Sequence, residues 1–377
     1  MHLIYNHEPR KVGVAVQRRI NALKIGQRMQ DLPEELWHDS FYYYVKEDQT
    51  RVGGPNLRLI RLDPDEPSLT VTGHIFNKFV HPYENRFITP REAARLQGFP
   101  DNLQFHGSLT SVQRQVGDAV PIRLGIAVFE TLLKTMKGVY PHKQNFLALS
   151  LFSGAGGFDI AAEQAGAEAN ARIEPLACVE IEKDRCDTLR GYFSNRVKVC
   201  QNDIRDLTPI TFITDCGLTQ KNIDLIYGGP PCQSFSQAGK QTGVEDPRGD
   251  LIFEFIRFIN EIKPPFFVME NVSNLRAIDK GRLLHRILNA MWDAGYVVKH
   301  QVLLATDYGS PQRRRRLIFV GTRHDIEFQA KLPEPTHGEI QSLLNLKPIR
   351  TVRDAFKGLP SPDYEPVQVP PITLPTD

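Results

Sequence analysis

Between residues 146 and about 320, short apolar runs alternate with amphipathic segments, and this alternation constrains the fold more than any other feature of the chain. The apolar runs predict strands, and amphipathic segments such as Leu251–Ile262 and Gly281–Ala290 predict helices. Strands that alternate with helices form a mainly parallel α/β sheet with helices on both faces. The strand candidates are Phe146–Phe152, Ala177–Ile181, Ile223–Tyr227, Phe266–Met269, Tyr296–Leu304 and Leu317–Val320.

The residues before this stretch predict three helices. A helical pattern covers Val14–Leu23. A second helix begins after Thr89, because Pro90 suits the first helical position and Glu92 stands three residues after the cap. A third helix covers Pro121 to about Met136, and the polar stretch 137–145 follows it. The proline-rich residues 323–377 are expected to be extended and to depend on packing against another part of the chain.

Composition restricts the class of protein. A length of 377 residues suggests about two domains. The net charge of +2 is too small to indicate nucleic-acid binding by itself, so an anion-binding surface must be local. The five cysteines contain no Cys-x-x-Cys pair, which argues against a zinc ribbon and favours a reducing compartment. No apolar run reaches the length of a signal peptide or a membrane span. We therefore expect a cytoplasmic enzyme without a metal site.

A glycine-rich turn, Phe152-Ser153-Gly154-Ala155-Gly156-Gly157, follows the first strand candidate. Glycines here let the backbone pass close to a ligand at the carboxyl edge of a parallel sheet. The second strand candidate ends near Glu180, whose carboxylate can bind a pair of ribose hydroxyls. This pairing favours a nucleoside-containing cofactor, although the same features also occur with a purely structural role. The glycine spacing differs from G-x-G-x-x-G and counts against a nicotinamide cofactor.

Cys232 stands in the sequence Gly228-Gly229-Pro230-Pro231-Cys232-Gln233, just after another strand candidate. The glycines and prolines place its thiol on a rigid turn that a ligand can reach. A thiolate there acts as a nucleophile when a neighbouring group lowers its pKa. A lone cysteine is usually a small buried hydrophobic residue, the role expected for Cys178 and Cys200. The surroundings of Cys232 favour the nucleophile.

Charged residues stand beside two further strand candidates. Glu270 follows an apolar run, and partial burial would raise its pKa and suit it to donate a proton. A cap on the following helix is the alternative role for Glu270. Before the last strand, alternation places Arg314 and Arg316 on one face and Arg313 and Arg315 on the other. We expect some of these arginines to face the sheet edge and to bind an anionic or carbonyl group.

Together these motifs resemble the DNA (cytosine-5) methyltransferases of bacterial restriction–modification systems. The glycine turn is similar to the cofactor loop of that family, and the Pro-Pro-Cys turn is similar to its nucleophile loop. Glu270-Asn271-Val272 and the arginine run resemble two further catalytic motifs, and the segments 91–100 and 115–121 resemble the last two motifs. The resemblance implies a Rossmann-like, S-adenosyl-L-methionine-dependent catalytic domain and a small DNA-recognition domain.

The resemblance also implies a reaction. The Cys232 thiolate adds to C6 of a cytosine flipped out of duplex DNA, and C5 then attacks the methyl group of S-adenosyl-L-methionine. Glu270 would hydrogen-bond or protonate ring N3, and Arg314 and Arg316 would hold the base carbonyl and the catalytic loop. The implied cofactor-binding residues are Phe152, Ser153, Gly154, Ala155, Gly156, Gly157, Glu180, Ile181, Asp203, Ile204, Pro231, Leu251, Asp118, Ala119 and Val120.

Two features depart from the family pattern. Asp118 stands where the family usually has Asn, beside the methionine end of the cofactor. The two motifs that normally close the chain precede the cofactor loop here, so the sequence resembles a circular permutation, which is feasible because domain ends commonly lie close together. The expected parts are a recognition domain from 1–85 and 323–377, a hinge and returning helix at 86–137, a linker at 138–145, and the catalytic domain at 146–322.

Double-stranded DNA is the expected partner, and a cognate restriction endonuclease would act on the same site without direct contact. We expect a monomer in the bacterial cytoplasm, associated with the nucleoid through DNA. Two alternatives remain. A tRNA cytosine-5 methyltransferase would use the same cofactor and nucleophile. A catalytically inactive DNA-binding homologue would lack at least one catalytic residue, whereas every such residue is present in this sequence.

Overall fold

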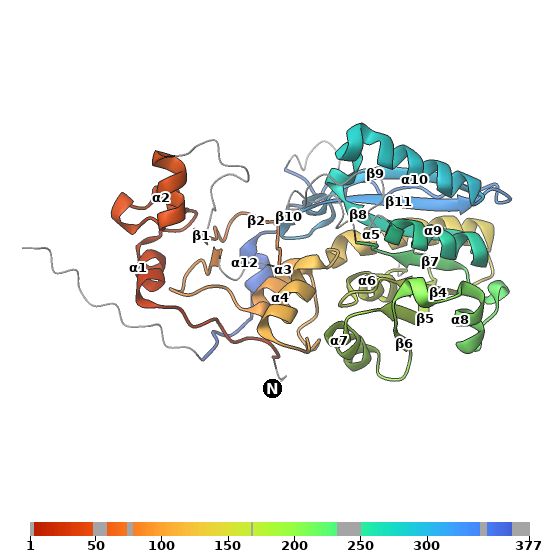
Figure 1. The fold of residues 1–377 in the computed structure, drawn as a ribbon, viewed down its shortest axis with the longest axis horizontal. Coiled ribbons are helices and arrows are strands. Elements are labelled where there is room, and N and C mark those ends of the chain that lie inside the picture. The colour runs from red at the N-terminus through yellow and green to blue at the C-terminus, as the bar shows by residue number, and fades with distance from the viewer. Residues whose placement is uncertain are drawn as a thin grey trace, which may run out of the picture.

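The computed structural model describes residues 4–47, 59–73, 78–166, 169–231, 250–339 and 345–363. Its central feature is a seven-stranded sheet of order β6-β5-β4-β7-β8-β11-β9 (Figure 1). Strand β11 is antiparallel to β8 and β9, and the other neighbouring strands are parallel. The mainly parallel α/β fold is therefore confirmed. The strands are β4 (Asn145–Leu151), β5 (Arg172–Glu180), β6 (Lys198–Gln201), β7 (Leu225–Gly228), β8 (Phe266–Val272), β9 (Tyr296–Leu304) and β11 (Arg315–Arg323).

Helices cover both faces of this sheet because the side chains of its strands alternate between two cores. Phe146 and Ala148 of β4 belong to the core shared with α5 and α6, whereas Leu149 and Leu151 belong to the core shared with α9 and α10. The helices around the sheet are α5 (Ile122–Val139), α6 (Gly157–Gln164), α7 (Lys183–Phe193), α8 (Pro209–Asp215), α9 (Asp250–Ile262) and α10 (Arg282–Asp293). This arrangement leaves the carboxyl edge of the parallel strands open for a site.

The remaining elements lie to one side of the sheet, with α3, α4 and α12 between the sheet and α1 and α2 (Figure 1). All of them precede or follow the sheet in the sequence except β10, which lies between β9 and β11. They are α1 (Val14–Ala22), α2 (Asp39–Lys46), β1 (Ile60–Arg61), β2 (Ser68–Leu69), β3 (Phe79–Val80), α3 (Pro90–Gln97), α4 (Leu109–Asp118), β10 (Gln312–Arg313) and α12 (Val352–Phe356). Short 3₁₀ helices are η1 (Met29–Asp31), η2 (Glu34–Leu36), η4 (Ile204–Asp206), η5 (Gln220–Asn222), η8 (Ser273–Gly281) and η9 (Ala305–Tyr308).

The amino-terminal part has a hydrophobic core of its own. Ile20 of α1, Phe41 of α2 and Val80 of β3 are among the buried residues of this core, and every member comes from the residues before α3. The carboxyl-terminal helix α12 packs instead against α3, and its Val352 belongs to the core of the large sheet. The structure thus joins the two outer segments through α3 and the sheet, and the proposed division into domains stays a prediction.

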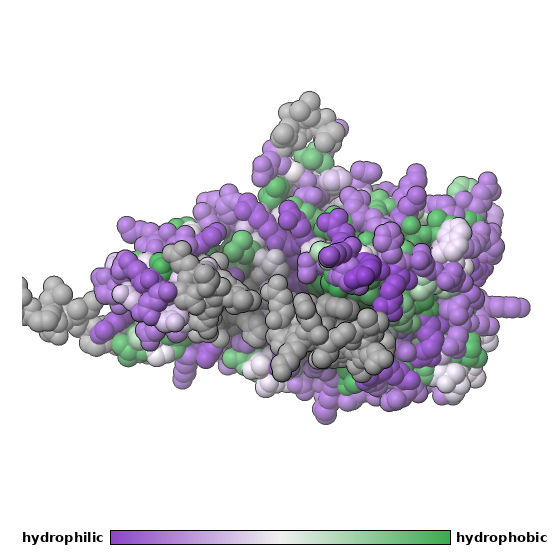
Figure 2. Space-filling model, turned by 45° about the horizontal axis from the view of Figure 1, so that its top comes forward, coloured by the Kyte–Doolittle hydropathy of each residue, from purple (hydrophilic) through white to green (hydrophobic). Residues whose placement is uncertain are grey.

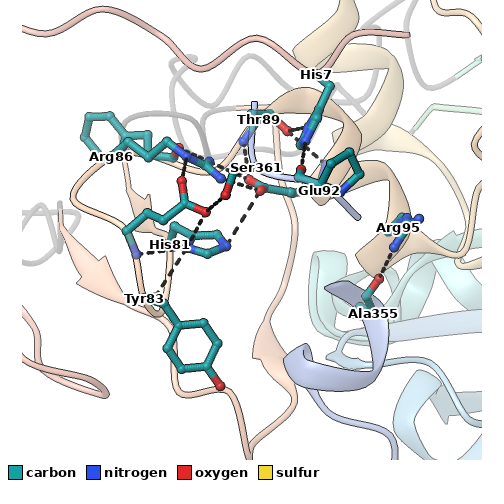
Figure 3. A network of polar contacts seen from close by, with 12 residues as sticks. His7, His81, Tyr83, Arg86, Thr89, Glu92, Arg95, Ala355 and Ser361 are labelled. Atoms are coloured by element: carbon teal, nitrogen blue, oxygen red, sulfur yellow. Dashed lines mark hydrogen bonds and ion pairs between the residues drawn. The ribbon is translucent and has the colours of Figure 1, made fainter. Parts of the chain in front are cut away.

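The two outer segments meet at the start of α3 (Figure 3). Nδ1 of His7 lies 2.8 Å from the hydroxyl oxygen of Thr89, and Nε2 of His7 lies 2.7 Å from the carbonyl oxygen of Pro360. The hydroxyl of Ser361 donates a hydrogen bond of 2.8 Å to Glu84. Segments near the two ends of the chain are therefore in direct contact.

Where Figure 2 colours the surface by hydropathy, most residues are hydrophilic and hydrophobic residues are scattered among them. In the described part of the chain no helix is long and apolar enough to cross a membrane.

Candidate active site

The turn after β4 brings its glycines to the carboxyl edge of the sheet. Phe152, Gly154 and Gly156 have positive φ values of 56°, 59° and 83°. This conformation suits glycine but is strained for Phe152, which ends the strand one residue earlier than the sequence predicts; such strain concentrates at functional sites. A Cβ atom on Gly157 would lie 2.9 Å from the carbonyl oxygen of Val120. The turn therefore touches the segment 118–120 assigned to the same site.

Glu180 at the end of β5 is held by the backbone around it. One carboxylate oxygen accepts a hydrogen bond of 2.8 Å from the amide of Gly154, and the other accepts bonds of 2.9 Å from the amides of Ile181 and Glu182. These bonds fix the carboxylate against the glycine turn. The neighbouring Ile181 side chain is 56% exposed, an apolar surface against which a flat ring can pack.

Glu270 and the Pro-Pro turn lie side by side at the ends of β8 and β7. The amide of Asn271 donates a hydrogen bond of 2.9 Å to the carbonyl oxygen of Pro230. A Cβ atom on Gly229 would lie 3.0 Å from a carboxylate oxygen of Glu270. The other oxygen forms an ion pair of 2.5 Å with Nε of Arg316. Burial raises the pKa of Glu270, and the charge of Arg316 opposes this rise. The carboxylate thus pairs with Arg316 at the cavity.

The arginine run alternates as the sequence predicts. Arg314 is buried and donates hydrogen bonds to the carbonyl oxygens of Val71 and Asp118. Arg313 and Arg315 are exposed on the opposite face, where Arg313 forms an ion pair of 2.6 Å with Glu66. Arg314 therefore links the strand to two distant backbone segments, a contact that the sequence does not reveal.

Asp118 forms an ion pair of 2.8 Å with Arg185 of α7. Burial lowers the pKa of Arg185, but the charges of Glu180 and Asp118 outweigh burial and raise it. The carboxylate that replaces the usual Asn is therefore matched by a fixed positive charge at the same edge of the site.

One cavity of about 660 Å³ collects these groups. It is lined by every predicted site residue except Gly156, which lies within the glycine turn, and Cys232, which lies outside the described residues. Pro231, the residue before Cys232, does line the cavity. The predicted residues that line it are Phe152, Ser153, Gly154, Ala155, Gly157, Glu180, Ile181, Asp203, Ile204, Pro231, Leu251, Asp118, Ala119, Val120, Glu270, Arg314 and Arg316.

The cavity also contains residues that sequence reasoning missed. Arg185 and Asn271 line it, as do Thr70, Thr72 and Gly73 of the amino-terminal part. The sequence could have indicated Asn271, because it stands next to Glu270 inside the same motif. No sequence feature indicates Arg185, since an arginine on an amphipathic helix is usually a solvated residue.

Comparison with known proteins connects this geometry to a family. A family model described as C-5 cytosine-specific DNA methylase matches residues 2–134 and 146–365. The Type II methyltransferase M.AquIA of Picosynechococcus sp. is 40% identical over 227 residues, which cover 56% of this chain and 88% of that protein. M1.HphI of Haemophilus parahaemolyticus is 39% identical over 197 residues, which cover 52% of this chain and 50% of that protein. M.BsuRI of Bacillus subtilis is 37% identical over 233 residues, which cover 56% of this chain and 50% of that protein. The chain thus spans about half the length of the last two relatives.

Proposed function

We propose that this chain, which belongs to the family of C-5 cytosine-specific DNA methylases, transfers a methyl group from S-adenosyl-L-methionine to C5 of a cytosine in a specific short sequence of duplex DNA. One observation carries the proposal: a single cavity joins the glycine turn and Glu180 to the paired side chains of Glu270 and Arg316. A cofactor region and an acid region of this kind are what methyl transfer to a ring carbon requires.

The residues at one end of the cavity fit the cofactor. A volume of about 660 Å³ lies within the range of small-molecule sites. The carboxylate of Glu180 stands at the ribose position of a nucleoside site, and the exposed Ile181 side chain can pack against an adenine ring. Asp118 and Arg185 offer opposite charges to an amino-acid moiety. When bound, S-adenosyl-L-methionine supplies an electrophilic methyl group.

Glu270, Arg314 and Arg316 line the other end, where they fit a flipped-out cytosine. The Cys232 thiolate adds to C6, which makes C5 nucleophilic, and the thiolate leaves again when the C5 proton has been lost. Glu270 donates a hydrogen bond or proton to ring N3, a role that its raised pKa favours. Arg316 holds Glu270 in position and, like Arg314, is proposed to stabilise the base carbonyl and the catalytic loop.

The replacement Cys232→Ser tests the nucleophile. We expect it to abolish methyl transfer to duplex DNA and to leave the affinity for S-adenosyl-L-methionine nearly unchanged, because a hydroxyl is a much poorer nucleophile than a thiolate. Transfer of a labelled methyl group and calorimetric titration of the cofactor measure the two effects. Cys216→Ser, at the end of α8 and away from the cavity, is the matched control and should retain activity. Normal turnover of the Cys232 variant would remove this residue from the mechanism.

We also propose that the chain is a circular permutation, with 138–145 as the linker. Three findings support this proposal. The family model matches two stretches that are interrupted at 135–145. Helix α5 packs against α6, through Phe129 and Phe158 among others. His7 contacts Pro360.

In this proposal the protein works as a monomer in the bacterial cytoplasm, bound to the nucleoid through its substrate, and a cognate endonuclease acts on the same site. Sequencing the methylated cytosines of cells that express the protein identifies the target.

A further inference from the structure

A second cavity, of about 260 Å³, lies apart from the cofactor cavity and shares no lining residue with it. Four separate parts of the chain form its walls: the end of α3 with the loop that follows, the start of α5, Pro311 just before β10, and the segment that contains α12. The charged side chains of the wall are Arg95, Asp101, Arg123, Arg350 and Asp354. This cavity is not used by the methyl-transfer mechanism.

The positive charges of this cavity are only partly neutralised. Arg95 is satisfied, because it pairs with Asp101 at 2.5 Å and donates to the carbonyl oxygens of Ala355 and Lys357. The side chains of Arg123 and Arg350 form no hydrogen bond or ion pair with another residue in the part of the chain that the structure describes. Each is half-buried. Withdrawing a guanidinium from water without an anion costs free energy. A bound anion would therefore stabilise this pair of side chains.

Several positively charged side chains lie close enough to this cavity to affect one another. Burial and the charge of Arg350 lower the pKa of Arg123. Burial also lowers the pKa of His337, and the charges of Arg350, Lys347 and Arg123 add to this effect. Arg123 is the second residue of α5, whose 18 residues begin without an acidic side chain in the first turn and without a side-chain cap. The amide groups at the start of such a helix attract an anion.

The gap beside these amides is kept open by Gly98. A Cβ atom at this position would lie 3.8 Å from the amide nitrogen of Ile122 and 3.9 Å from that of Arg123. Gly98 has a φ of 91°, a conformation that other residues rarely adopt. Two guanidinium groups, a helix start and a glycine therefore converge on one hollow.

We propose that this cavity is a binding site for a tetrahedral oxyanion of the phosphate class, held by the guanidinium groups of Arg123 and Arg350. Guanidinium groups bind phosphate oxygens through paired hydrogen bonds, which makes arginine the usual residue at such sites. The phosphate is either free or part of the backbone of bound DNA. Only the second source rests on the proposed function.

The first test uses the full chain without DNA. Inorganic phosphate is added to wild-type protein and to the double variant Arg123→Gln/Arg350→Gln, with chloride at the same ionic strength as the reference. We expect phosphate to raise the unfolding temperature of the wild type, and the double variant to lose at least about tenfold in affinity, because it keeps no charged donor at the two positions. Arg353→Gln is the matched control, because Arg353 stands on α12 outside the cavity and pairs with Asp65.

Without phosphate, the double variant should unfold at the same temperature as the wild type or a higher one, since the substitution relieves repulsion between like charges. A lower temperature would mean that the two arginines serve the fold. Phosphate protection that persists in the double variant would also overturn the proposal.

The second test identifies the source of the phosphate. The affinity for duplex DNA is measured at several salt concentrations, and each lost phosphate contact reduces the slope of log K against log salt by about 0.9. A smaller slope in the double variant, with an unchanged slope in Arg353→Gln, indicates a backbone phosphate, whether or not free phosphate binds. An unchanged slope together with phosphate protection indicates a free anion. No protection of the wild type and an unchanged slope would refute the site. Because the first test needs no DNA, phosphate protection of the wild type that is lost in the double variant supports the site even if the protein fails to methylate DNA.

Discussion

The carboxyl group of Glu270 is subject to two opposing influences. Burial favours its neutral form, whereas the guanidinium of Arg316 favours its charged form, and burial dominates. A carboxyl group with a raised pKa takes up a proton more readily than an exposed one and can share it with a ring nitrogen as charge develops there. The opposing effects of burial and Arg316 on the pKa of Glu270 therefore suit the proton transfer proposed for this cavity.

We expect Glu270→Gln to slow the chemical step by about 10²–10⁴-fold, the usual contribution of a general acid. Single-turnover methyl transfer measures this step, and a binding titration with duplex DNA should show a much smaller change. If binding weakened while the rate stayed the same, Glu270 would have a structural role.

Asp159 lies fully buried in α6, beneath the glycine turn. The hydroxyl of Tyr227 donates a hydrogen bond of 3.1 Å to one carboxylate oxygen, and the other oxygen has no partner in the described residues. Burial raises the pKa of Asp159 to about 7, from an ordinary value of 3.8. Between these two pH values the unfolded chain loses the proton and the folded chain keeps it. The folded state therefore loses stability as pH rises from about 4 to about 7, and the loss is constant above that range.

The variant Asp159→Asn should lack this dependence. Relative to the wild type, it should gain stability as pH rises through the same range, by at most about 4 kcal/mol for a shift of roughly three pKa units. Urea unfolding at a series of pH values provides the measurement. A stability difference that stays constant from pH 4 to pH 7 would show that Asp159 does not hold the raised pKa.

At the scale of elements, α3 shows how far local signals reach. Its amino terminus is predicted to the residue, because the capping box needs only Thr89 and Glu92. The Thr89 hydroxyl accepts a bond of 3.2 Å from the Glu92 amide, and the Glu92 carboxylate accepts one of 2.7 Å from the Thr89 amide. The edge strand β6 was not predicted, because the strand Lys198–Gln201 is short and some of its residues are polar. Its existence depends on pairing with β5, which no local pattern encodes.

Thr89→Ala should destabilise the protein by about 1–2 kcal/mol, because the first turn of α3 loses its cap. The same change also removes the hydroxyl that His7 contacts. Chemical denaturation monitors the effect, and Thr89→Ser is the control that keeps the hydroxyl and should be nearly neutral. Equal stability of the Ala and Ser variants would show that the cap contributes little.

At the scale of the whole molecule, the sequence motifs predict only some of the residues that line the candidate site. The motifs around Glu180, Glu270 and Arg316 were predictable, because each follows or precedes a strand that ends at the same sheet edge. The contribution of Thr70, Thr72 and Gly73 was not predictable, because these residues reach the cavity from a distant part of the chain. Likewise, the sequence left open whether the outer segments pack against each other or against the large domain, and in the structure α12 packs against α3 and the core of the large sheet.

The contact between His7 and Pro360 predicts that the two ends of the chain can be joined and the backbone cut at another position without loss of the fold. If residue 377 is joined to residue 1 and the chain is opened between Pro141 and His142, both exposed, the product should fold and methylate the same DNA sites. Its unfolding temperature should stay within about 5 °C of the original, because few contacts change. Bisulfite sequencing and thermal unfolding test both statements. The matched control opens the same closed chain inside α5, between Phe129 and Glu130, and should fail to fold. Failure of both variants would contradict the permutation.

The position of α5 before β4 has a consequence for the folding pathway. Only residues 140–156 separate α5 from its packing partner α6. In the motif order usual for the family, the corresponding helix would close the chain, and bringing the pair together would close a loop roughly twentyfold longer at an additional entropic cost of about 2.6 kcal/mol. Here the two helices and β4 leave the ribosome one after another. The permuted order thus converts a long-range pairing into a local one, which lowers the contact order of this part of the core and suits it to fold early during synthesis.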